Sequence, residues 1–527
     1  MNTINRIIYC IIDSVRADQF FQLINKGFLP NFKKLYDEGI YSKNCITDFP
    51  AVTYPSQVSM ITGTYTGDFN NELCHGVPLY NWMDRSVDPP LLRSYGTYGS
   101  DERIQIYKMN EDIGRKCQTI LEMIDEGNKA SILQFINRGA NYFYPENKIK
   151  LAFYYLLLKN SNSIEKHLYR LNTVVTMKIL NLFEKPHKFF NIDEVPIASL
   201  LWFASPDILL HLYGSQSKQY ILNLMHVDKN VGIMLNKLDT LGYLDDTAIA
   251  IISDHGNYPV KEFGNLSSFV QKYRLQNYHP RKNRKAIINI TDFGSIGFIN
   301  IKPKDCYSET YWNPPKLYDI ENFGLDKINL LSELFKIKGC ELLYYRGDEN
   351  RSDKGVVHLK RKMENSDEFI SASIEYQGFG KDLRIKYKNE NQNHDIFDFN
   401  IDESSAKMLD NRFHTLKEWL ESTYHVDYPI YPELLIRHFK NPRGGDIIIS
   451  TKGSIVYNIT HGVEKKPNRF VHDIGLRRCS IVPLLIGGSK EIPHKEIKCC
   501  RIVDLVPTLL KMIKKNPHES VMGDSLV

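Results

Sequence analysis

Two continuous apolar runs, each followed closely by an aspartate, constrain the fold of this chain more than any other feature of its sequence. Residues 7–12 (IIYCII) lead into Asp13, and residues 247–252 (TAIAII) lead into Asp254 and His255. A strand that is apolar on both faces is typical of a parallel sheet covered by helices on each side. Since ligands bind beyond the carboxyl ends of such strands, these aspartates are placed for chemistry. An ordinary turn carboxylate is the alternative interpretation of each.

Segments of helical periodicity separate these strands and predict an α/β fold, with a central, mostly parallel sheet and helices on both of its faces. Residues 30–40 and 218–240 are amphipathic in the helical sense. Residues 481–488 read as a further strand, and residues 502–512 read as a closing helix with a proline in its first turns.

The composition changes between residues 258 and 440, where Asn, Lys, Tyr and Asp become frequent and the periodicity weakens. Within this segment, residues 288–301 and 369–387 alternate as antiparallel strands do. We therefore predict an inserted α+β cap at 258–440. The catalytic core is then expected to comprise 1–257 and 441–527, with a helical insertion at about 86–200.

Composition and charge exclude several classes of function. The net charge is +5 over 527 residues, which gives no support to binding of a nucleic-acid polymer. No apolar run is long enough for a membrane span, and the first residues lack the pattern of a signal peptide. Nine cysteines without a C-x-x-C pair argue against a zinc–thiolate site and a disulfide framework. We expect a soluble, cytoplasmic protein.

The stretch FPAVTYPSQVSMITG places a threonine, Thr53, at the beginning of a predicted helix. Pro55 is favoured in the first helical turn, because its missing N–H group is not needed there. A helix N-terminus favours an oxyanion, which here is either a deprotonated threonine oxygen or a phosphate group. A hydroxyl is a poor nucleophile unless a base or a metal ion activates it. An ordinary helix-capping threonine is the alternative.

Candidate metal ligands occur at wide separations along the chain. Asp13, Asp254 and His255 follow predicted strands, and Asp207 and His211 are four residues apart, so they share one face of a helix. Aspartate and histidine are suitable ligands for Zn²⁺ or a similar divalent ion. One parallel sheet would bring these residues together. Taken singly, the Asp207/His211 pair could equally be a surface pair on a helix, and each strand-end residue could be an ordinary turn residue.

Six stretches in this order resemble the alkaline phosphatase superfamily, and within it the type I phosphodiesterase/nucleotide pyrophosphatase branch. The resemblance covers residues 5–85, 200–258 and 440–512, and it implies an alkaline-phosphatase-like fold with two divalent metal ions, zinc being the expected element. The stretches are IIDSVRAD, FPAVTYPSQVSMITG, SPDILLHLYG, IAIISDHG, VPLLIGG and RIVDLVPTLL.

Carried over residue by residue, the resemblance implies two metal sites. One is formed by Asp13, Asp254 and His255 with the Thr53 oxygen, and the other by Asp207, His211 and a third histidine. His461 has the following glycine that the family shows, but His472 has the family's spacing to the strand at 481–488, and we favour His472. Asn81 follows His75-Gly76 much as a phosphate-binding asparagine does in the family, and a turn residue is its equal alternative.

The resemblance implies a two-metal phosphoric ester hydrolase that acts on a small-molecule phosphate ester. Thr53 would attack phosphorus, and water would hydrolyse the resulting phosphothreonine. A phosphomonoesterase or phosphomutase of the same superfamily is the alternative. A sulfatase is disfavoured, because the nucleophile position holds threonine and the following motif is Tyr-Pro-Ser-Gln. A non-catalytic binding protein is the remaining alternative, although each ligand position has a candidate.

Overall fold

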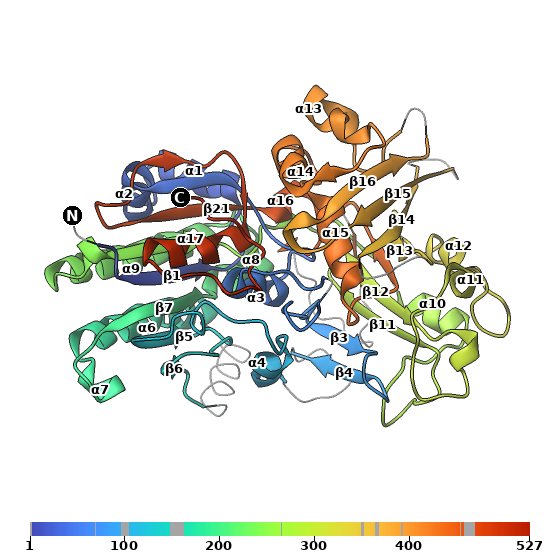
Figure 1. The fold of residues 1–527 in the computed structure, drawn as a ribbon, viewed down its shortest axis with the longest axis horizontal. Coiled ribbons are helices and arrows are strands. Elements are labelled where there is room, and N and C mark those ends of the chain that lie inside the picture. Colours follow the sequence, from blue (N-terminus) through green and yellow to red (C-terminus); the bar gives the residue numbers. More distant parts are fainter. Residues whose placement is uncertain are drawn as a thin grey trace.

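The structure is a computed structural model that describes residues 3–68, 70–95, 105–147, 163–264, 266–348, 353–363, 368–391, 394–453, 455–457 and 470–527. His461, the alternative third ligand, lies outside the described residues. In Figure 1 the chain forms two parts side by side, each built around one large sheet.

The first large sheet has nine strands in the order β22-β2-β21-β8-β1-β7-β5-β6, with β23 also paired to β2 (Figure 1). Its centre is parallel, because β1 runs parallel to both β7 and β8, while β21 is antiparallel to its neighbours β8 and β2. The strands are β1 (Arg6–Ile12), β2 (Ile40–Ile46), β5 (Asn128–Ile132), β6 (Tyr142–Tyr144), β7 (Pro196–Phe203), β8 (Thr247–Ile252), β21 (Ile481–Gly488), β22 (Lys495–Glu496) and β23 (Cys500–Arg501).

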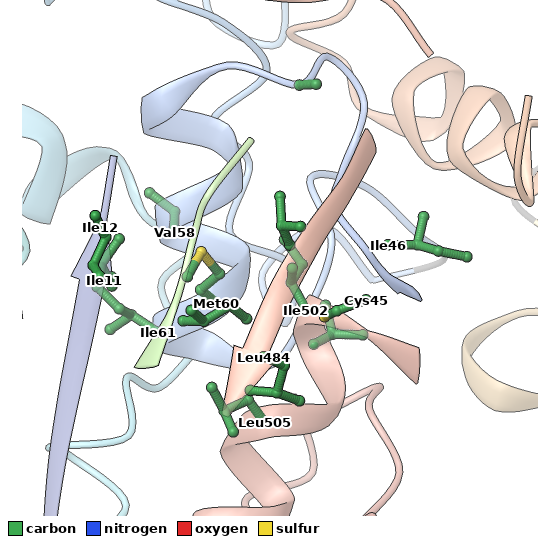
Figure 2. Packing of buried hydrophobic residues seen from close by; sticks show 14 of the residues in the cluster. Ile11, Ile12, Cys45, Ile46, Val58, Met60, Ile61, Leu484, Ile502 and Leu505 are labelled. Carbon is green, nitrogen blue, oxygen red and sulfur yellow. The ribbon is translucent and has the colours of Figure 1, made fainter. Parts of the chain in front are cut away.

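Burial on both faces explains why the central strands are apolar throughout. Residues 7–12 of β1 and all of β8 are buried, and they lie in register as direct neighbours. Figure 2 shows Ile11 and Ile12 of β1 packed near Val58, Met60 and Ile61 of helix α3. The helices that cover this sheet are α1 (Ala17–Asn25), α2 (Pro30–Glu38), α3 (Thr53–Thr62), α6 (Ile164–Glu184), α9 (Lys218–Thr240) and α17 (Leu505–Met512).

The second large sheet is antiparallel throughout, in the order β11-β12-β18-β13-β14-β15-β16-β17. Strand pairs at 288–301 and 369–387 are therefore confirmed. Helices α14 (Leu416–Thr423) and α15 (Tyr431–Lys440) accompany this sheet (Figure 1). The strands are β11 (Ile288–Phe293), β12 (Ile296–Ile301), β13 (Leu342–Arg346), β14 (Lys354–Lys362), β15 (Phe369–Gln377), β16 (Arg384–Asn389), β17 (His414–Thr415) and β18 (Ile447–Ser450).

Strand β18 differs from the expectation that the core resumes at 441. It lies in the middle of the antiparallel sheet, between β12 and β13. Its sequence, IIIS, is as apolar as that of a core strand, and all four of its residues are buried. A run of this kind indicates burial but does not identify the sheet that it joins.

The predicted helical insertion at about 86–200 is wrong in part. Among its described residues, 105–147 contain two strands, β5 and β6, which extend the parallel sheet beyond β7. Buried Ile120, Leu121 and Ile124 lie just before β5 at a spacing that imitates a helix, although most of the segment has no regular structure. Among the described residues of this segment, α6 is the long helix, while residues 148–162 lie outside the described part of the chain.

Short elements complete the described fold. Among the described residues, no helix is both long and apolar enough to cross a bilayer. Three small sheets pair β3 (Asn81–Asp84) with β4 (Leu91–Ser94), β9 (Tyr258–Pro259) with β20 (Phe470–Val471), and β10 (Glu262–Gly264) with β19 (Ile455–Tyr457). The short helices are α4 (Met109–Asp112), α7 (His187–Phe190), α8 (Ser205–Tyr213), α10 (Ser267–Lys272), α11 (Leu317–Glu321), α12 (Leu330–Leu334), α13 (Glu403–Ala406) and α16 (Arg477–Ser480).

Candidate metal centre and nucleophile

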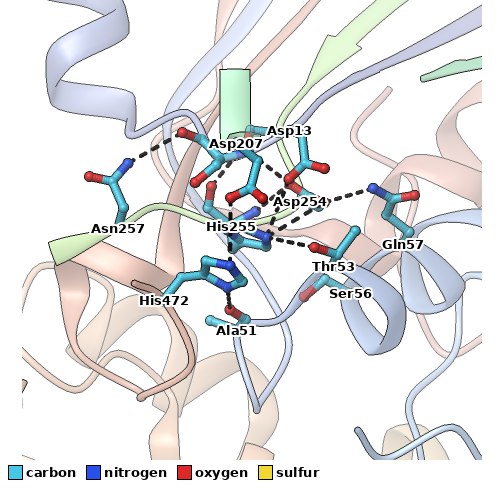
Figure 3. A network of polar contacts seen from close by, with 12 residues as sticks. Asp13, Ala51, Thr53, Ser56, Gln57, Asp207, Asp254, His255, Asn257 and His472 are labelled. Atoms are coloured by element: carbon cyan, nitrogen blue, oxygen red, sulfur yellow. Dashed lines mark hydrogen bonds and ion pairs between the residues drawn. The ribbon is translucent and has the colours of Figure 1, made fainter. Parts of the chain in front are cut away.

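The carboxyl ends of three neighbouring parallel strands carry most of the predicted ligands. Asp13 follows β1, Asp254 and His255 follow β8, and Asp207 lies in the first turn of α8, which follows β7 directly. Because β7, β1 and β8 are adjacent and parallel, their ends meet at one edge of the sheet. Figure 3 shows these side chains converging with Thr53 and with His472, which follows β20.

Asp13, Asp254 and His255 form one compact group whose ligand atoms all lie within 4.8 Å of one another. His255 Nε2 is 3.4 Å from Asp13 Oδ1 and 3.8 Å from Asp254 Oδ2. All three side chains are buried. This is the group that the resemblance implies for one metal ion.

Asp207 and His472 form a second group, which shares His255 with the first. His472 Nε2 is 3.6 Å from Asp207 Oδ1, and the His472 and His255 rings stack with centroids 3.6 Å apart. His211 stands at the edge of this group, with its Nε2 atom 3.3 Å from Asp207 Oδ2 and its ring centroid 5.3 Å from that of His472. The structure thus brings His211 to the site, but the compact second group contains His255 in its place.

The three histidines are oriented as metal ligands are. In each ring Nδ1 lies within hydrogen-bond distance of a backbone carbonyl: 2.7 Å to Phe470 for His211, 3.1 Å to Gly256 for His255, and 3.0 Å to Ala51 for His472. A proton on Nδ1 leaves Nε2 with a free lone pair that points at the carboxylates. Ligating histidines almost always have such a partner for their second nitrogen.

The carboxylates of this site face histidines rather than lysine or arginine side chains. Asp13 Oδ1 and Asp207 Oδ1 are buried and accept no hydrogen bond from any residue that the structure describes. No lysine or arginine among those residues forms an ion pair with Asp13, Asp207 or Asp254. Buried charges in proteins are paired or coordinate metal ions. The donor set and these two unpartnered oxygens fit a pair of divalent cations.

The pKa shifts agree with this interpretation. Burial, and after it the carboxylates of Asp254 and Asp207, hold the pKa of Asp13 well above its usual range. Burial would raise the pKa of Asp207 too, but His211 and then His472 outweigh it and lower that pKa. Burial and His255 lower the pKa of His472 well below its usual value, which keeps the ring neutral as a ligand must be.

Thr53 is the first residue of helix α3, one position inside the helix rather than just ahead of it. Its side chain is 6% exposed, and its Oγ1 atom lies 3.2 Å from His255 Nε2 (Figure 3). The first N–H groups of a helix have no partner inside it and add the positive end of the helix dipole. The threonine oxygen therefore lies at a helix N-terminus, where negative charge is stabilised.

Three supporting side chains were not anticipated from the sequence. Trp202 Nε1 donates to Asp13 Oδ2 at 3.1 Å, and Gln57 Nε2 donates to Asp254 Oδ2 at 2.7 Å. Gln134 Nε2 donates in turn to Gln57 Oε1 at 2.8 Å. Gln57 lies one helical turn after Thr53 in the stretch that the sequence singled out, so helical spacing alone was a signal for it. Trp202 and Gln134 had no signal of this kind.

Asn81 begins strand β3, and its neighbour Tyr80 stacks on Tyr54 with ring centroids 4.3 Å apart. Tyr54 directly follows Thr53, so this strand starts beside helix α3. The Asn81 Oδ1 atom is buried and accepts no hydrogen bond from a described residue. Its role toward a phosphate group stays a prediction.

A family model described as type I phosphodiesterase / nucleotide pyrophosphatase matches residues 8–319, which is more than half of the chain. The chain belongs to this family. The resemblance noted in the sequence is thereby confirmed. The match extends through the Thr53 stretch, α8 and β8, and therefore includes all the ligand candidates except the two alternative third histidines, His461 and His472.

The curated relatives of this phosphodiesterase-family chain are distant in sequence. The chain is 26% identical over 234 residues to ectonucleotide pyrophosphatase/phosphodiesterase family member 1 of Rattus norvegicus, a match that covers 44% of the chain and 22% of that protein. It is 20% identical over 319 residues to venom phosphodiesterase 2 of Crotalus adamanteus, which covers 58% and 35%. The matches thus span only part of the length of these relatives.

Solved structures show that the fold is shared along nearly the whole chain. Human ectonucleotide pyrophosphatase/phosphodiesterase 5 superposes with a TM-score of 0.55 at 13% identity, covering 99% of this chain and 97% of that one. The murine protein in complex with AMP superposes with a TM-score of 0.54 at 12% identity, covering 98% and 96%. These likenesses confirm the α/β, alkaline-phosphatase-like fold class.

Proposed function

We propose that this chain hydrolyses small-molecule phosphoric esters through a phosphothreonine formed on Thr53. The preferred substrates would be phosphodiesters and nucleotide pyrophosphates. One observation carries the proposal: the Thr53 hydroxyl lies 3.2 Å from His255 Nε2, the atom that both candidate metal groups share. Membership of the phosphodiesterase/nucleotide pyrophosphatase family supports the reaction class.

Two divalent cations, with zinc as the first choice, complete the proposed site. Asp13, Asp254 and His255 would hold one, while Asp207 and His472 would hold the other with His211 beside them. When bound, such ions make a hydroxyl more acidic and neutralise charge on the oxygens of a phosphoryl group.

The residues of the chain then perform the displacement. The start of α3 holds the Thr53 oxygen in place, and this oxygen forms a bond to phosphorus as the bond to the leaving oxygen breaks. The hydroxyl proton leaves Thr53 in the same step and passes to solvent. Water then hydrolyses the phosphothreonine, which restores the threonine and releases the phosphate product. We assign Asn81 as a hydrogen-bond donor to a phosphoryl oxygen.

Substrate comparison separates this proposal from its alternatives. A phosphodiesterase has a higher kcat/KM for bis-p-nitrophenyl phosphate and for the p-nitrophenyl ester of thymidine monophosphate than for p-nitrophenyl phosphate. A phosphomonoesterase reverses that order. A phosphomutase moves phosphate between positions of a sugar, and a binding protein on a degenerate fold turns over none of the three substrates when supplied with Zn²⁺.

Replacing the nucleophile gives the decisive test. Thr53→Ala should lower kcat by at least about a thousandfold, since it removes the hydroxyl that forms the covalent intermediate. Its zinc content and thermal midpoint should stay close to those of the parent, because none of the carboxylates or imidazoles is changed. Steady-state kinetics with added Zn²⁺ and metal analysis of the purified protein measure both.

Thr64 provides the matched control for that change. It is a buried threonine just beyond the same helix, and its hydroxyl has no hydrogen-bond partner among the described residues. Thr64→Ala should keep full activity. Activity retained by Thr53→Ala, or lost equally by Thr64→Ala, would remove Thr53 from the mechanism.

We also propose a cytoplasmic location. All nine cysteines are free thiols, and eight of them are buried. Thiols persist in reducing compartments, whereas oxidising ones favour disulfides. Fractionation of the native host cells, followed by immunoblotting, tests this location directly.

A further inference from the structure

A hairpin of the antiparallel sheet contacts Asp473, the residue that directly follows His472. The contact is made by the cap hairpin, defined here as β11 and β12 with their turn Gly294–Ser295. Ser295 N donates to Asp473 Oδ2 at 2.5 Å, and the Tyr258 hydroxyl donates to Asp473 Oδ1 at 2.7 Å. Both carboxylate oxygens of this buried side chain are thus held by hydrogen bonds.

The turn of the cap hairpin is shaped around that carboxylate. Gly294 has φ +59°, and a Cβ atom at this position would lie 1.8 Å from Asp473 Oδ2, so only glycine fits. The Tyr258 hydroxyl also lies 2.6 Å from Ser295 Oγ, which closes a small buried network of three residues. Tyr258 itself pairs with Val471, the residue before His472, across the β9–β20 ladder.

From Asp473 the contacts continue to the nucleophile. The Asp473 carbonyl accepts a hydrogen bond from Ala51 N at 3.1 Å, and the Ala51 carbonyl lies 3.0 Å from His472 Nδ1. Ala51 is two residues before Thr53. One backbone segment, anchored through the Asp473 side chain, therefore faces both a candidate metal ligand and the loop that leads into the nucleophile's helix.

We infer that Asp473 is a positioning residue through which the cap hairpin sets His472 and the Thr53 loop in their working geometry. The cap hairpin holds the Asp473 carboxylate by hydrogen bonds, and this keeps the backbone of residues 472–473 in place. That backbone orients His472 Nε2 toward Asp207 and holds Ala51. This inference rests on the proposed function for its kinetic consequence, while its consequence for metal binding does not depend on the substrate.

The experiment compares zinc affinity and kinetics in matched variants. Asp473→Ala removes both hydrogen bonds and should weaken binding of Zn²⁺ about 10–100-fold, the usual cost of losing a partner that orients a ligand. Its kcat for bis-p-nitrophenyl phosphate should fall by a similar factor, while KM changes by less than about threefold, because substrate groups are untouched. Asp473→Asn keeps an acceptor for Ser295 N and should stay within about threefold of the parent in both quantities.

A second pair of variants keeps the test decisive if Asp473→Ala does not fold. Tyr258→Phe removes one hydrogen bond to Asp473 and should weaken zinc binding measurably. Tyr457→Phe is its control, since Tyr457 is buried, its N–H donates to the Gly294 carbonyl, and its hydroxyl has no partner among the described residues. The control should bind zinc as the parent does.

The outcomes separate the inference from the proposed function. A folded Asp473→Ala protein with the parent's zinc affinity would overturn the positioning role, as would equal losses in Asp473→Asn and Asp473→Ala. If Tyr258→Phe and Tyr457→Phe bind zinc equally, the role is likewise overturned. A parent protein that binds zinc but hydrolyses no phosphate ester would contradict the proposed function, and the affinity comparison would still decide the role of Asp473.

Discussion

At the scale of residues, the site depends on which atom of each side chain is engaged. The three histidines direct Nδ1 to backbone carbonyls and leave Nε2 for the centre of the site. The carboxylates are treated in the same way, because Trp202 holds one oxygen of Asp13 and Gln57 holds one oxygen of Asp254. Side chains that are fixed in this manner keep metal ions and a reacting group at defined positions.

Gln57 is the supporting residue whose loss we expect to matter most. Gln57→Leu removes the 2.7 Å hydrogen bond to Asp254 and should lower zinc affinity or kcat about 10–100-fold. Gln134→Leu should have a smaller effect, because Gln134 reaches Asp254 only through Gln57. The double variant should then be no worse than Gln57→Leu alone. Zinc affinity and kcat, measured for the parent and the three variants, complete a double-mutant cycle.

Gln19→Leu controls for the loss of a buried glutamine, since Gln19 donates to the Ser215 carbonyl and not to a candidate metal ligand. It should leave zinc affinity unchanged. Additive losses in the Gln57 and Gln134 double variant would show instead that the two glutamines act independently.

At the scale of elements, the sequence was sufficient wherever a strand or helix is long and its burial is uniform. Strand β8 and helix α9 have the predicted bounds, and β1 is longer by one residue. The strand-end position of Asp13 and Asp254 followed from the parallel-sheet pattern. Short strands such as β5, and the membership of β18 in the second sheet, were not predictable, because pairing partners are chosen by tertiary contacts that a local pattern does not contain.

The same limit applies to the site. The types and the strand ends of its ligands were predicted from the sequence together with the family resemblance. The sharing of His255 between two groups, and the contact of Asp473 with the cap hairpin, depend on how separate loops meet in space. Neither arrangement produces a periodic pattern that could be recognised in the sequence.

Helix α15 contains a buried histidine that makes stability depend on pH. Burial, with Arg346 nearby, lowers the pKa of His438 to about 3, and its Nε2 atom accepts a hydrogen bond from Gly445 N at 3.2 Å. In the unfolded chain this histidine takes up a proton near pH 6.5, whereas in the folded chain it stays neutral down to about pH 3. The folded state is therefore penalised progressively as the pH falls from 6.5 toward 3.

We predict that His438→Gln flattens this dependence. Glutamine keeps an acceptor for Gly445 N but does not titrate, so the fall in unfolding free energy between pH 6 and pH 4 should be smaller by about 1.4 kcal/mol per pH unit. Denaturant unfolding in the presence of a chelator, at several pH values, measures the slope. Exposed His394, replaced in the same way, should leave the slope unchanged. Parallel curves for His438→Gln and the parent would refute the prediction.

At the scale of the whole molecule, a buried ionic cluster joins the two large sheets. Asp68, in the loop after α3, lies 2.9 Å from Arg437 Nη1 and 2.9 Å from Lys440 Nζ of helix α15. It also accepts a hydrogen bond from Gly380 N in the turn between β15 and β16. Burial would raise the pKa of Asp68, but Arg437 and Lys440 outweigh it and lower that pKa.

Breaking this cluster should destabilise the protein strongly. Arg437→Met leaves Asp68 and Glu433 buried with fewer cationic partners and should cost about 3–5 kcal/mol of unfolding free energy. Adding Asp68→Asn should restore part of that loss, because the uncompensated charge is removed. Chemical denaturation with circular dichroism provides the measurement.

The exposed pair of Lys381 and Asp524 is the comparison for that experiment. Their side chains are 52% and 66% exposed at 2.8 Å, so Lys381→Met should cost no more than about 1 kcal/mol. Equal losses for Arg437→Met and Lys381→Met would show that burial of the cluster adds nothing to its strength.

The wide spacing of the ligands along the chain has a consequence during biosynthesis. Asp13 and Thr53 leave the ribosome long before the β20 segment and His472, which follows it. The second group of candidate ligands includes His472, so it is incomplete in any nascent chain that has not reached this residue. We therefore expect a chain that stops before His472 to lack the complete second group of candidate ligands.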